Sequence, residues 1–163
     1  SRVTGKSDGW KASEIVDQIV ATRRQPGATG HILFSFKPLM RDTGGIATAL
    51  TGQLYRGRAL VPASPWLDNQ PPSAPAAAVV SSDNPGEMLI RWQGTGNEPA
   101  WLWALYAKVG NSWMFDVLPA GQTSIRFPRT GPGAPSVVAV SAVDRVGNES
   151  PRTIVIGQGA RTP

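Results

Sequence analysis

Cysteine is absent from the sequence, and histidine occurs once, at His31. Without cysteine the chain can form no disulfide bond, no thiolate metal site and no cysteine nucleophile. With a single histidine it can form no metal site of several imidazoles, and we expect His31 to be a polar residue in a barrel interior or at the start of a strand. We therefore predict no metal and no cofactor. The lack of cysteine assigns no compartment, because an exported protein can dispense with disulfide bonds.

Long apolar runs and clusters of like charge are also missing. No run approaches the roughly 20 apolar residues of a membrane-spanning helix. The 16 Lys and Arg exceed the 11 Asp and Glu and give a net charge of +5, but they are scattered along the chain, which is typical of a solvated surface. Nucleic-acid binding would need an aromatic platform or a reading helix. We find neither, and expect no nucleic-acid partner and no membrane span.

A strong strand pattern is present near the C-terminus. In residues 137–143 valines alternate with small residues, as in a β-strand. Asp144 to Asn148 then supply turn chemistry, because Gly147 tolerates positive φ and Asp144 can accept hydrogen bonds from its own backbone. Residues 153–156 predict a second strand. Together they predict a hairpin that needs a larger sheet.

Seven short segments with a period of two follow residue 72. They are 77–80, 88–92, 103–109, 113–117, 123–127, 137–143 and 153–156. Turn residues such as Asp-Asn-Pro-Gly at 83–86 separate them. Seven strands at this spacing predict a β-sandwich, and we expect Trp92 to lie in its core.

The N-terminal part has a different pattern. Apolar residues at helical spacing predict an amphipathic helix over 11–24, with Ser7 or Asp8 as its cap, and a second helix over 45–55. Residues 31–36 are an apolar run of strand length, which predicts a strand buried on both faces. With an extended segment at 1–4, the order is βαβα, typical of an α/β fold.

A proline-rich stretch separates the two patterns. Residues 59–75 contain five prolines and can neither continue a helix nor enter a central strand. We place a domain boundary near Gln70, which gives two domains, residues 1–70 and 71–163. The predicted fold class is α/β followed by all-β.

Residues 73–158 resemble a fibronectin type III domain of the kind common in bacterial secreted enzymes. The resemblance depends on the proline-rich start, on Trp92 at the end of Met-Leu-Ile-Arg-Trp, and on the stretch Ala-Val-Asp-Arg-Val-Gly-Asn-Glu-Ser at 142–150. The sixth strand carries no tyrosine, which departs from the usual tyrosine corner of the family. The resemblance implies a β-sandwich of fibronectin type III topology.

Residues 1–67 resemble the C-terminal end of the barrel of glycoside-hydrolase-like family 10, a bacterial envelope family. The residues that carry this resemblance are Arg2, Val3, Trp10, Glu14, Ile15, Gln18, Arg23, the run from Gly30 to Ser35, Tyr55, Ala59, Leu60, Pro62 and Trp66. It implies the last βα units of a (β/α)8 TIM barrel. It also implies hydrolysis of a bacterial glycan, with peptidoglycan as a candidate substrate, and an extracytoplasmic location that is periplasmic, envelope-anchored or secreted.

A complete (β/α)8 barrel needs about 250 residues, so we expect this chain to hold only its end and to be a fragment. A glycosidase needs two carboxylates that flank the scissile bond. The acids before Gln70 are Asp8, Glu14, Asp17, Asp42 and Asp68. Glu14 and Asp17 fall on the predicted helix, away from the rim of the barrel. We therefore assign no catalytic residue and expect the chain alone to be inactive.

The active face of a barrel is formed by the loops that follow its strands. By that rule we predict substrate-binding residues after the seventh and eighth strands. They are Lys6, Ser7, Asp8, Trp10, Ser35, Lys37 and Arg41. An exposed Trp can stack on a sugar ring, and Lys or Arg can pair with carboxylates. The alternatives are a hydrophobic staple for Trp10 and plain solvation for the charged residues.

Two further tryptophans are candidates for sugar stacking. Trp101 and Trp103 share one face of a predicted strand, because alternate residues point to opposite faces. If both face outward, they form an aromatic strip suited to a sugar. The alternative is that they pack in the core or against the barrel.

Two classes of function remain open at this point. The chain is either the C-terminal part of a glycan-cleaving enzyme or a non-catalytic carbohydrate-binding, protein-binding or spacer module. The expected partners are a glycan and, through the unpaired edge of the strand at residues 30–36, either the remainder of a barrel or a second copy of the chain. An upstream reading frame with about six more βα units would favour the enzyme.

Overall fold

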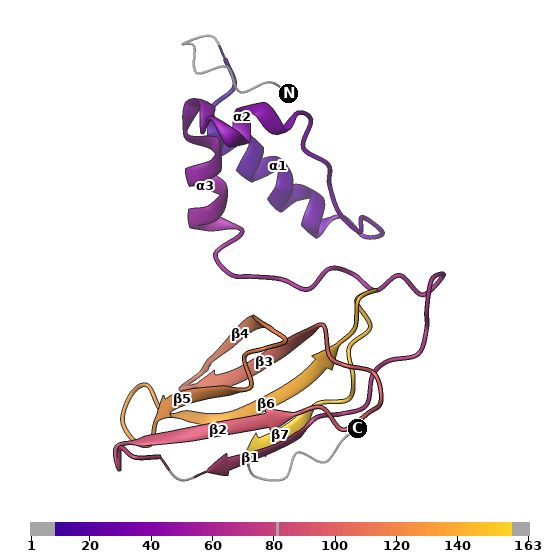
Figure 1. The fold of residues 1–163 in the computed structure, drawn as a ribbon. Coiled ribbons are helices and arrows are strands. Elements are labelled where there is room, and N and C mark those ends of the chain that lie inside the picture. The colour runs from indigo at the N-terminus through magenta and orange to yellow at the C-terminus, as the bar shows by residue number, and fades with distance from the viewer. Residues whose placement is uncertain (1–8, 81, 158–163) are drawn as a thin grey trace. The chain divides into compact units, whose positions relative to one another are not determined.

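The structure, a computed structural model, describes residues 9–80 and 82–157. The chain divides into two compact units, Ser1–Arg56 and Gly57–Pro163. In its described part the first unit contains helices and no strand, whereas the second is an antiparallel β-sandwich (Figure 1). Each unit has a hydrophobic core of its own.

The helical unit confirms both predicted helices. Its elements are α1 Ala12–Arg24, α2 Phe36–Met40, the 3-10 turn η1 Thr43–Gly45 and α3 Ile46–Gln53. Glu14 lies in the first turn of α1, and Arg23 and Arg24 lie in its last turn, which suits the helix dipole. The predicted caps Ser7 and Asp8, and the predicted extended segment at 1–4, lie outside the described residues.

The core of the helical unit is small. The residues buried between α1 and α3 are Ile15, Val16, Ile19, Ile46 and Leu50. On each helix they recur three or four positions apart, so they form one apolar stripe that faces the other helix. A core of this size supports only a marginally stable unit.

The strand predicted over residues 31–36 is wrong for this structure. Residues 28–35 form no regular element, and Phe36 begins α2. Ile32 and Phe34 are 94% and 95% exposed. A strand that is buried on both faces needs hydrogen-bonding neighbours, and the described residues of this unit supply none. The βαβα order and the open strand edge are therefore not found, and an exposed apolar loop takes their place.

The second unit confirms the seven predicted strands. They are β1 Ala76–Val80, β2 Glu87–Gln93, β3 Leu102–Val109, β4 Ser112–Pro119, β5 Ser124–Pro128, β6 Pro135–Val143 and β7 Thr153–Ile156. One sheet has the order β1-β2-β5 and the other β4-β3-β6-β7, with every pair antiparallel. The two sheets enclose a core between them (Figure 1).

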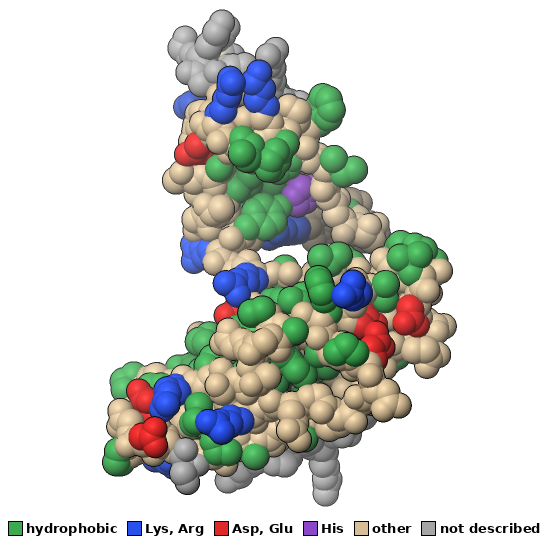
Figure 2. Space-filling model, viewed as in Figure 1, with side chains coloured by type: hydrophobic (Ala, Val, Ile, Leu, Met, Phe, Trp, Pro, Cys, Tyr) green, Lys and Arg blue, Asp and Glu red, His purple; other side chains and the backbone are tan. Residues whose placement is uncertain are grey.

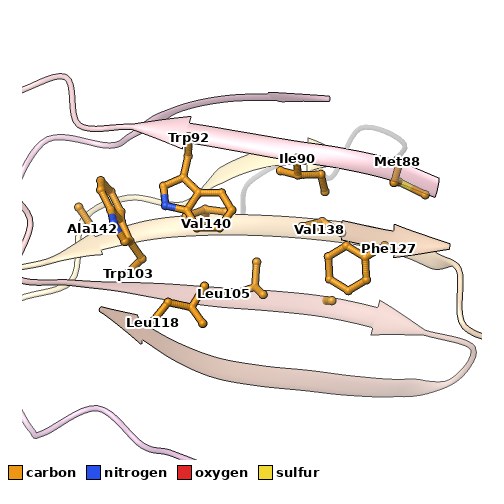
Figure 3. Packing of buried hydrophobic residues seen from close by; sticks show 11 residues of the cluster. Met88, Ile90, Trp92, Trp103, Leu105, Leu118, Phe127, Val138, Val140 and Ala142 are labelled. Carbon is orange, nitrogen blue, oxygen red and sulfur yellow. The ribbon is translucent and has the colours of Figure 1, made fainter. Parts of the chain in front are cut away.

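Figure 3 shows the core of the sandwich, in which side chains from both sheets meet. Trp92 on β2 and Trp103 on β3 are in edge-to-face contact, with ring centroids 6.4 Å apart. Ile90, Val138 and Val140 are fully buried beside them. The prediction that Trp92 lies in the core is confirmed.

The proline-rich segment that follows Arg56 belongs to the sandwich unit. The backbone N–H of Ser64 donates to the carbonyl of Val146 at 2.8 Å, and Asn148 Nδ2 donates to the carbonyl of Asp68 at 3.1 Å. The chain therefore divides after Arg56, earlier than the boundary expected near Gln70. Prolines prevented this segment from forming a strand, but they did not prevent it from packing along the sandwich.

Candidate functional site

The turn after β6 is organised by the buried carboxylate of Asp144. Its Oδ1 accepts hydrogen bonds from the backbone N–H groups of Val146 and Asn148, both at 2.9 Å. Its Oδ2 accepts a hydrogen bond from Asn148 Nδ2 at 2.8 Å. Gly147 has a φ of +89°, which favours glycine. The predicted turn chemistry is confirmed, and it fixes the loop in one geometry.

The segment 61–64 packs against the same turn. A Cβ atom placed on Gly147 would lie 2.8 Å from the carbonyl oxygen of Val61 and 3.1 Å from that of Pro62. Only glycine allows so close an approach of two backbones. The turn therefore serves as a support for this segment.

A shallow hollow of about 180 Å3 lies between the turn, the segment and the start of β3. Its lining comes from Leu60, Val61, Ser64, Leu67, Trp101, Leu102 and residues 143–147. The Trp101 side chain is 50% exposed, and the Cζ atom of Arg145 lies 4.5 Å from the centroid of its ring. This cation–π stack places a guanidinium beside an apolar hollow.

Trp103 is not available for sugar stacking. It is 4% exposed, and its Nε1 donates to the carbonyl of Ala120 at 3.0 Å. The predicted aromatic strip of Trp101 and Trp103 is therefore not formed. The alternation rule failed because β3 begins at Leu102, so Trp101 lies before the strand and does not follow its pleat.

The substrate-binding residues predicted in the helical unit are only partly described. Lys6, Ser7 and Asp8 lie outside the described residues. Trp10 is about half exposed and directly precedes Lys11, which caps α1. Ser35 caps α2, Lys37 lies in it, and Arg41 ends it, all three on the exposed surface. The structure shows Ser35, Lys37 and Arg41 as solvated positions on and beside one short helix.

A polar and aromatic cluster in the helical unit was not foreseen. The hydroxyl group of Tyr55 is hydrogen-bonded to Nε2 of His31, and the Cζ atom of Arg23 lies 5.2 Å from the centroid of the Tyr55 ring. Figure 2 shows the single histidine, in purple, beside hydrophobic side chains. His31 thus lies in a loop, and the prediction that it starts a strand is wrong. No spacing in the sequence signals this contact.

A second unforeseen network lies on the outer face of the four-stranded sheet. Glu149 Oε1 accepts hydrogen bonds from Tyr106 at 2.8 Å, Ser141 at 2.7 Å and Arg152 at 3.2 Å. Burial alone would raise the pKa of Glu149, but the hydrogen bonds from Ser141, Tyr106 and Arg152 together lower the pKa below its ordinary value. Burial, followed by the hydrogen bond to Glu149, raises the pKa of Tyr106. These groups tie β3 to β6 and to the loop before β7.

Asp42 has a structural role at the start of α3. Its carboxylate accepts hydrogen bonds from the N–H groups of Ala47 and Thr48, at 2.7 and 3.1 Å, and from the Thr48 hydroxyl at 2.6 Å. The hydrogen bond from the Thr48 side chain is the main cause that lowers the pKa of Asp42. The carboxylate is engaged in stabilising a helix end.

In residues 9–80 and 82–157 no group of three or more His, Asp or Glu side chains is placed to hold a metal ion. Within the same residues no helix is long and apolar enough to cross a bilayer.

Part of the chain is similar in sequence to a known protein. No family model matches the chain. Over 76 residues, 47% of the chain, it is 40% identical to the glycosyl hydrolase YngK of Bacillus subtilis. The chain spans 15% of the length of that relative. About half of this chain is thus similar to a short part of a glycosyl hydrolase.

Solved structures resemble the chain weakly. They include the spore cortex lytic enzyme SleM of Clostridium perfringens, with 18% identity, 53% of this chain and 29% of that chain covered, and a TM-score of 0.37. The glycoside hydrolase domain of Endo-D from Streptococcus pneumoniae R6 is 27% identical, with 54% of this chain and 15% of that chain covered and a TM-score of 0.37. A fibronectin type III domain of human contactin 1 is 13% identical, with 69% of this chain and 94% of that chain covered and a TM-score of 0.34. TM-scores this low do not decide the fold.

Proposed function

We propose that the chain is the C-terminal part of a glycoside-hydrolase-like family 10 protein that acts on a bacterial glycan outside the cytoplasm, with peptidoglycan as the candidate substrate. The observation that carries the proposal is the 40% identity to a glycosyl hydrolase over nearly half of the chain. In this proposal the helical unit is the end of a TIM barrel, and the sandwich is a fibronectin type III domain. The sheets of three and four strands agree with that second assignment.

Exposed apolar side chains on the helical unit support the proposal that another part of the protein packs against it. Ile32, Phe34, Phe36 and Met40 are all exposed, and they lie within ten residues of the chain. Exposed apolar side chains gathered in this way mark a surface that another part of a protein covers. We assign that role to the remainder of the barrel, against which residues 31–36 would find the strand neighbours that they lack here.

The positions of the acidic residues in the helical unit support the proposal that this chain alone is catalytically inactive. Glu14 accepts a hydrogen bond from Gln18 on the surface of α1, and the carboxylate of Asp42 is engaged at the start of α3. Asp17 is exposed on α1. Glu14 and Asp17 both lie on the exposed surface of one helix, whereas glycoside hydrolysis needs two carboxylates that flank the scissile bond.

The test compares this chain with the product of the complete natural reading frame. Both are incubated with purified peptidoglycan, and the release of reducing ends is measured. We expect turnover from the longer protein and none from this chain. Turnover by this chain that is abolished by Asp8→Asn but kept in the surface control Asp17→Asn would contradict the proposal, because the catalytic acid would then lie in this chain.

The second candidate function is a non-catalytic binding module. The observation that favours it is the half-exposed Trp101 with Arg145 beside an open hollow on the sandwich. Binding to a glycan by this chain, together with no hydrolysis by the complete protein, would favour the module over the enzyme.

A further inference from the structure

Arg145 is a cation held in place by an aromatic ring and not by an acid. In the described part of the chain, ion pairs form at Arg58, Arg126 and Arg152, and none forms at Arg145. The neighbouring carboxylate of Asp144 is buried, and both of its oxygens are occupied within the turn. Asp144 therefore forms no ion pair with Arg145.

The stack leaves the donors of the guanidinium free. The Cζ atom of Arg145 lies over the Trp101 ring, and a guanidinium that stacks on an aromatic ring keeps its N–H bonds in its own plane. That edge has the geometry to grip a carboxylate with two parallel hydrogen bonds. The stack also holds the guanidinium in position before a ligand arrives, which reduces the entropy lost on binding.

The wall next to Arg145 is apolar and open to solvent. Val61 and Leu67 are 74% and 71% exposed, and both line the same hollow as Trp101. The backbone of segment 61–64, which carries Val61, lies close against Gly147 in the turn that Asp144 organises. An apolar wall beside an aromatic ring suits the C–H face of a sugar, and the adjacent cation suits an acidic substituent.

We propose that this hollow binds a saccharide that carries a carboxylate, with the carboxylate on Arg145 and the sugar ring against Trp101, Val61 and Leu67. The proposal rests on the proposed function, because it names the class of glycan that the sandwich contacts. Charge complementarity selects an acidic sugar over a neutral one: the site offers a cation free of acidic partners in the described residues.

The experiment uses the whole chain, labelled with 15N, and two disaccharide probes. One is N-acetylglucosaminyl-N-acetylmuramic acid, and the other is N,N′-diacetylchitobiose (hereafter chitobiose), which is neutral and lacks the lactyl group with its carboxylate. Two-dimensional NMR titrations follow the indole N–H of Trp101 and the Nε–H of Arg145. The variants are Arg145→Gln, Arg145→Lys and Trp101→Ala, with Trp113→Ala as the matched control, since Trp113 is an exposed tryptophan on β4.

We expect the acidic disaccharide to shift both resonances and to bind about tenfold tighter than chitobiose, as one charge-assisted contact implies. Arg145→Gln should remove that preference, Arg145→Lys should keep part of it, and Trp113→Ala should change neither affinity. Trp101→Ala should weaken both probes. A short peptide with a free C-terminal carboxylate should bind more weakly than the acidic disaccharide.

Several results would overturn the proposal. They are equal affinity for the two disaccharides, and tighter binding of the peptide than of the acidic disaccharide. A loss of affinity in Trp113→Ala equal to that in Trp101→Ala, or no shift of the Trp101 indole resonance on titration, would also overturn it. The circular dichroism spectrum of each variant shows whether the fold is intact, and Arg145→Gln changes only an exposed side chain. Because the measurement is of binding and needs no hydrolysis, its failure is distinct from failure of the complete protein to cleave peptidoglycan.

Discussion

The sandwich and the helical unit differ in how many of their apolar side chains they bury. The sandwich encloses two tryptophans, a phenylalanine and several branched side chains between two sheets. The helical unit buries five aliphatic side chains and leaves Ile32, Phe34 and Phe36 on its surface. In both units apolar faces cover each other, but the two sheets enclose large aromatic side chains, whereas the two helices enclose a few aliphatic ones. We therefore expect the sandwich to be the more stable of the two units and the helical unit to be only marginally stable.

The largest effect should come from the core of the sandwich. Trp92→Ala empties a buried site that faces Trp103, which should lower the free energy of unfolding by about 3–5 kcal/mol. Urea unfolding followed by tryptophan fluorescence measures it. Trp113→Ala is the control, and it should change the stability by less than about 0.5 kcal/mol because Trp113 is exposed. Equal losses would mean that the core does not dominate the stability of this unit.

The next effect separates the two units. Ile19→Ala removes a buried side chain from α1 and should cost about 2–4 kcal/mol, enough to unfold a unit with so small a core. The helical signal in circular dichroism should fall, while the unfolding transition of the sandwich should remain within about 0.5 kcal/mol. The control Ile32→Ala changes a fully exposed residue and should alter neither. A shift of the sandwich transition in Ile19→Ala would show that the two units unfold together.

A smaller change in stability is expected where the segment 61–64 packs against the turn at Gly147. Gly147→Ala and Gly131→Ala both place a side chain at a φ of +89°, so each pays the same backbone strain of about 1–2 kcal/mol. The new Cβ meets the carbonyl of Val61 at position 147 and open space at position 131. Gly147→Ala should therefore be the more destabilising by about 1–3 kcal/mol in thermal denaturation. Equal losses would show that the segment is not held against this turn.

Local patterns account for what the sequence predicted well. The seven strands and the two long helices depend on periods of two and of three to four, which neighbouring residues determine. The apolar run at 31–36 failed because a buried strand also needs partners, and no local pattern reveals whether they are present. The boundary after Arg56 was missed because prolines exclude regular structure without excluding packing.

The candidate site could be predicted only in part. Trp101 was a candidate for a surface aromatic, with packing in the core left open as the alternative, and the turn at Asp144 to Asn148 was recognised from its residues. Arg145 was not, because its contact with Trp101 joins two loops that are distant in sequence and meet only when β3 and β6 pair. The contact of His31 with Tyr55 has the same origin. Contacts between distant loops follow from the fold, and a single sequence carries no direct signal for them.

The smallest effect concerns the pH dependence of the sandwich. Hydrogen bonds lower the folded-state pKa of Glu149 below its ordinary value, so the stabilisation is present above the ordinary glutamate pKa and is lost as the pH falls through the lowered one. Between pH 6 and about pH 3, the melting temperature of wild type should therefore fall more steeply than that of Glu149→Gln, which cannot titrate. Glu98→Gln, an exposed change in the loop before β3, is the control and should keep the slope of wild type. Identical slopes in wild type and Glu149→Gln would show that the contacts with Tyr106, Ser141 and Arg152 do not stabilise the charged form of Glu149.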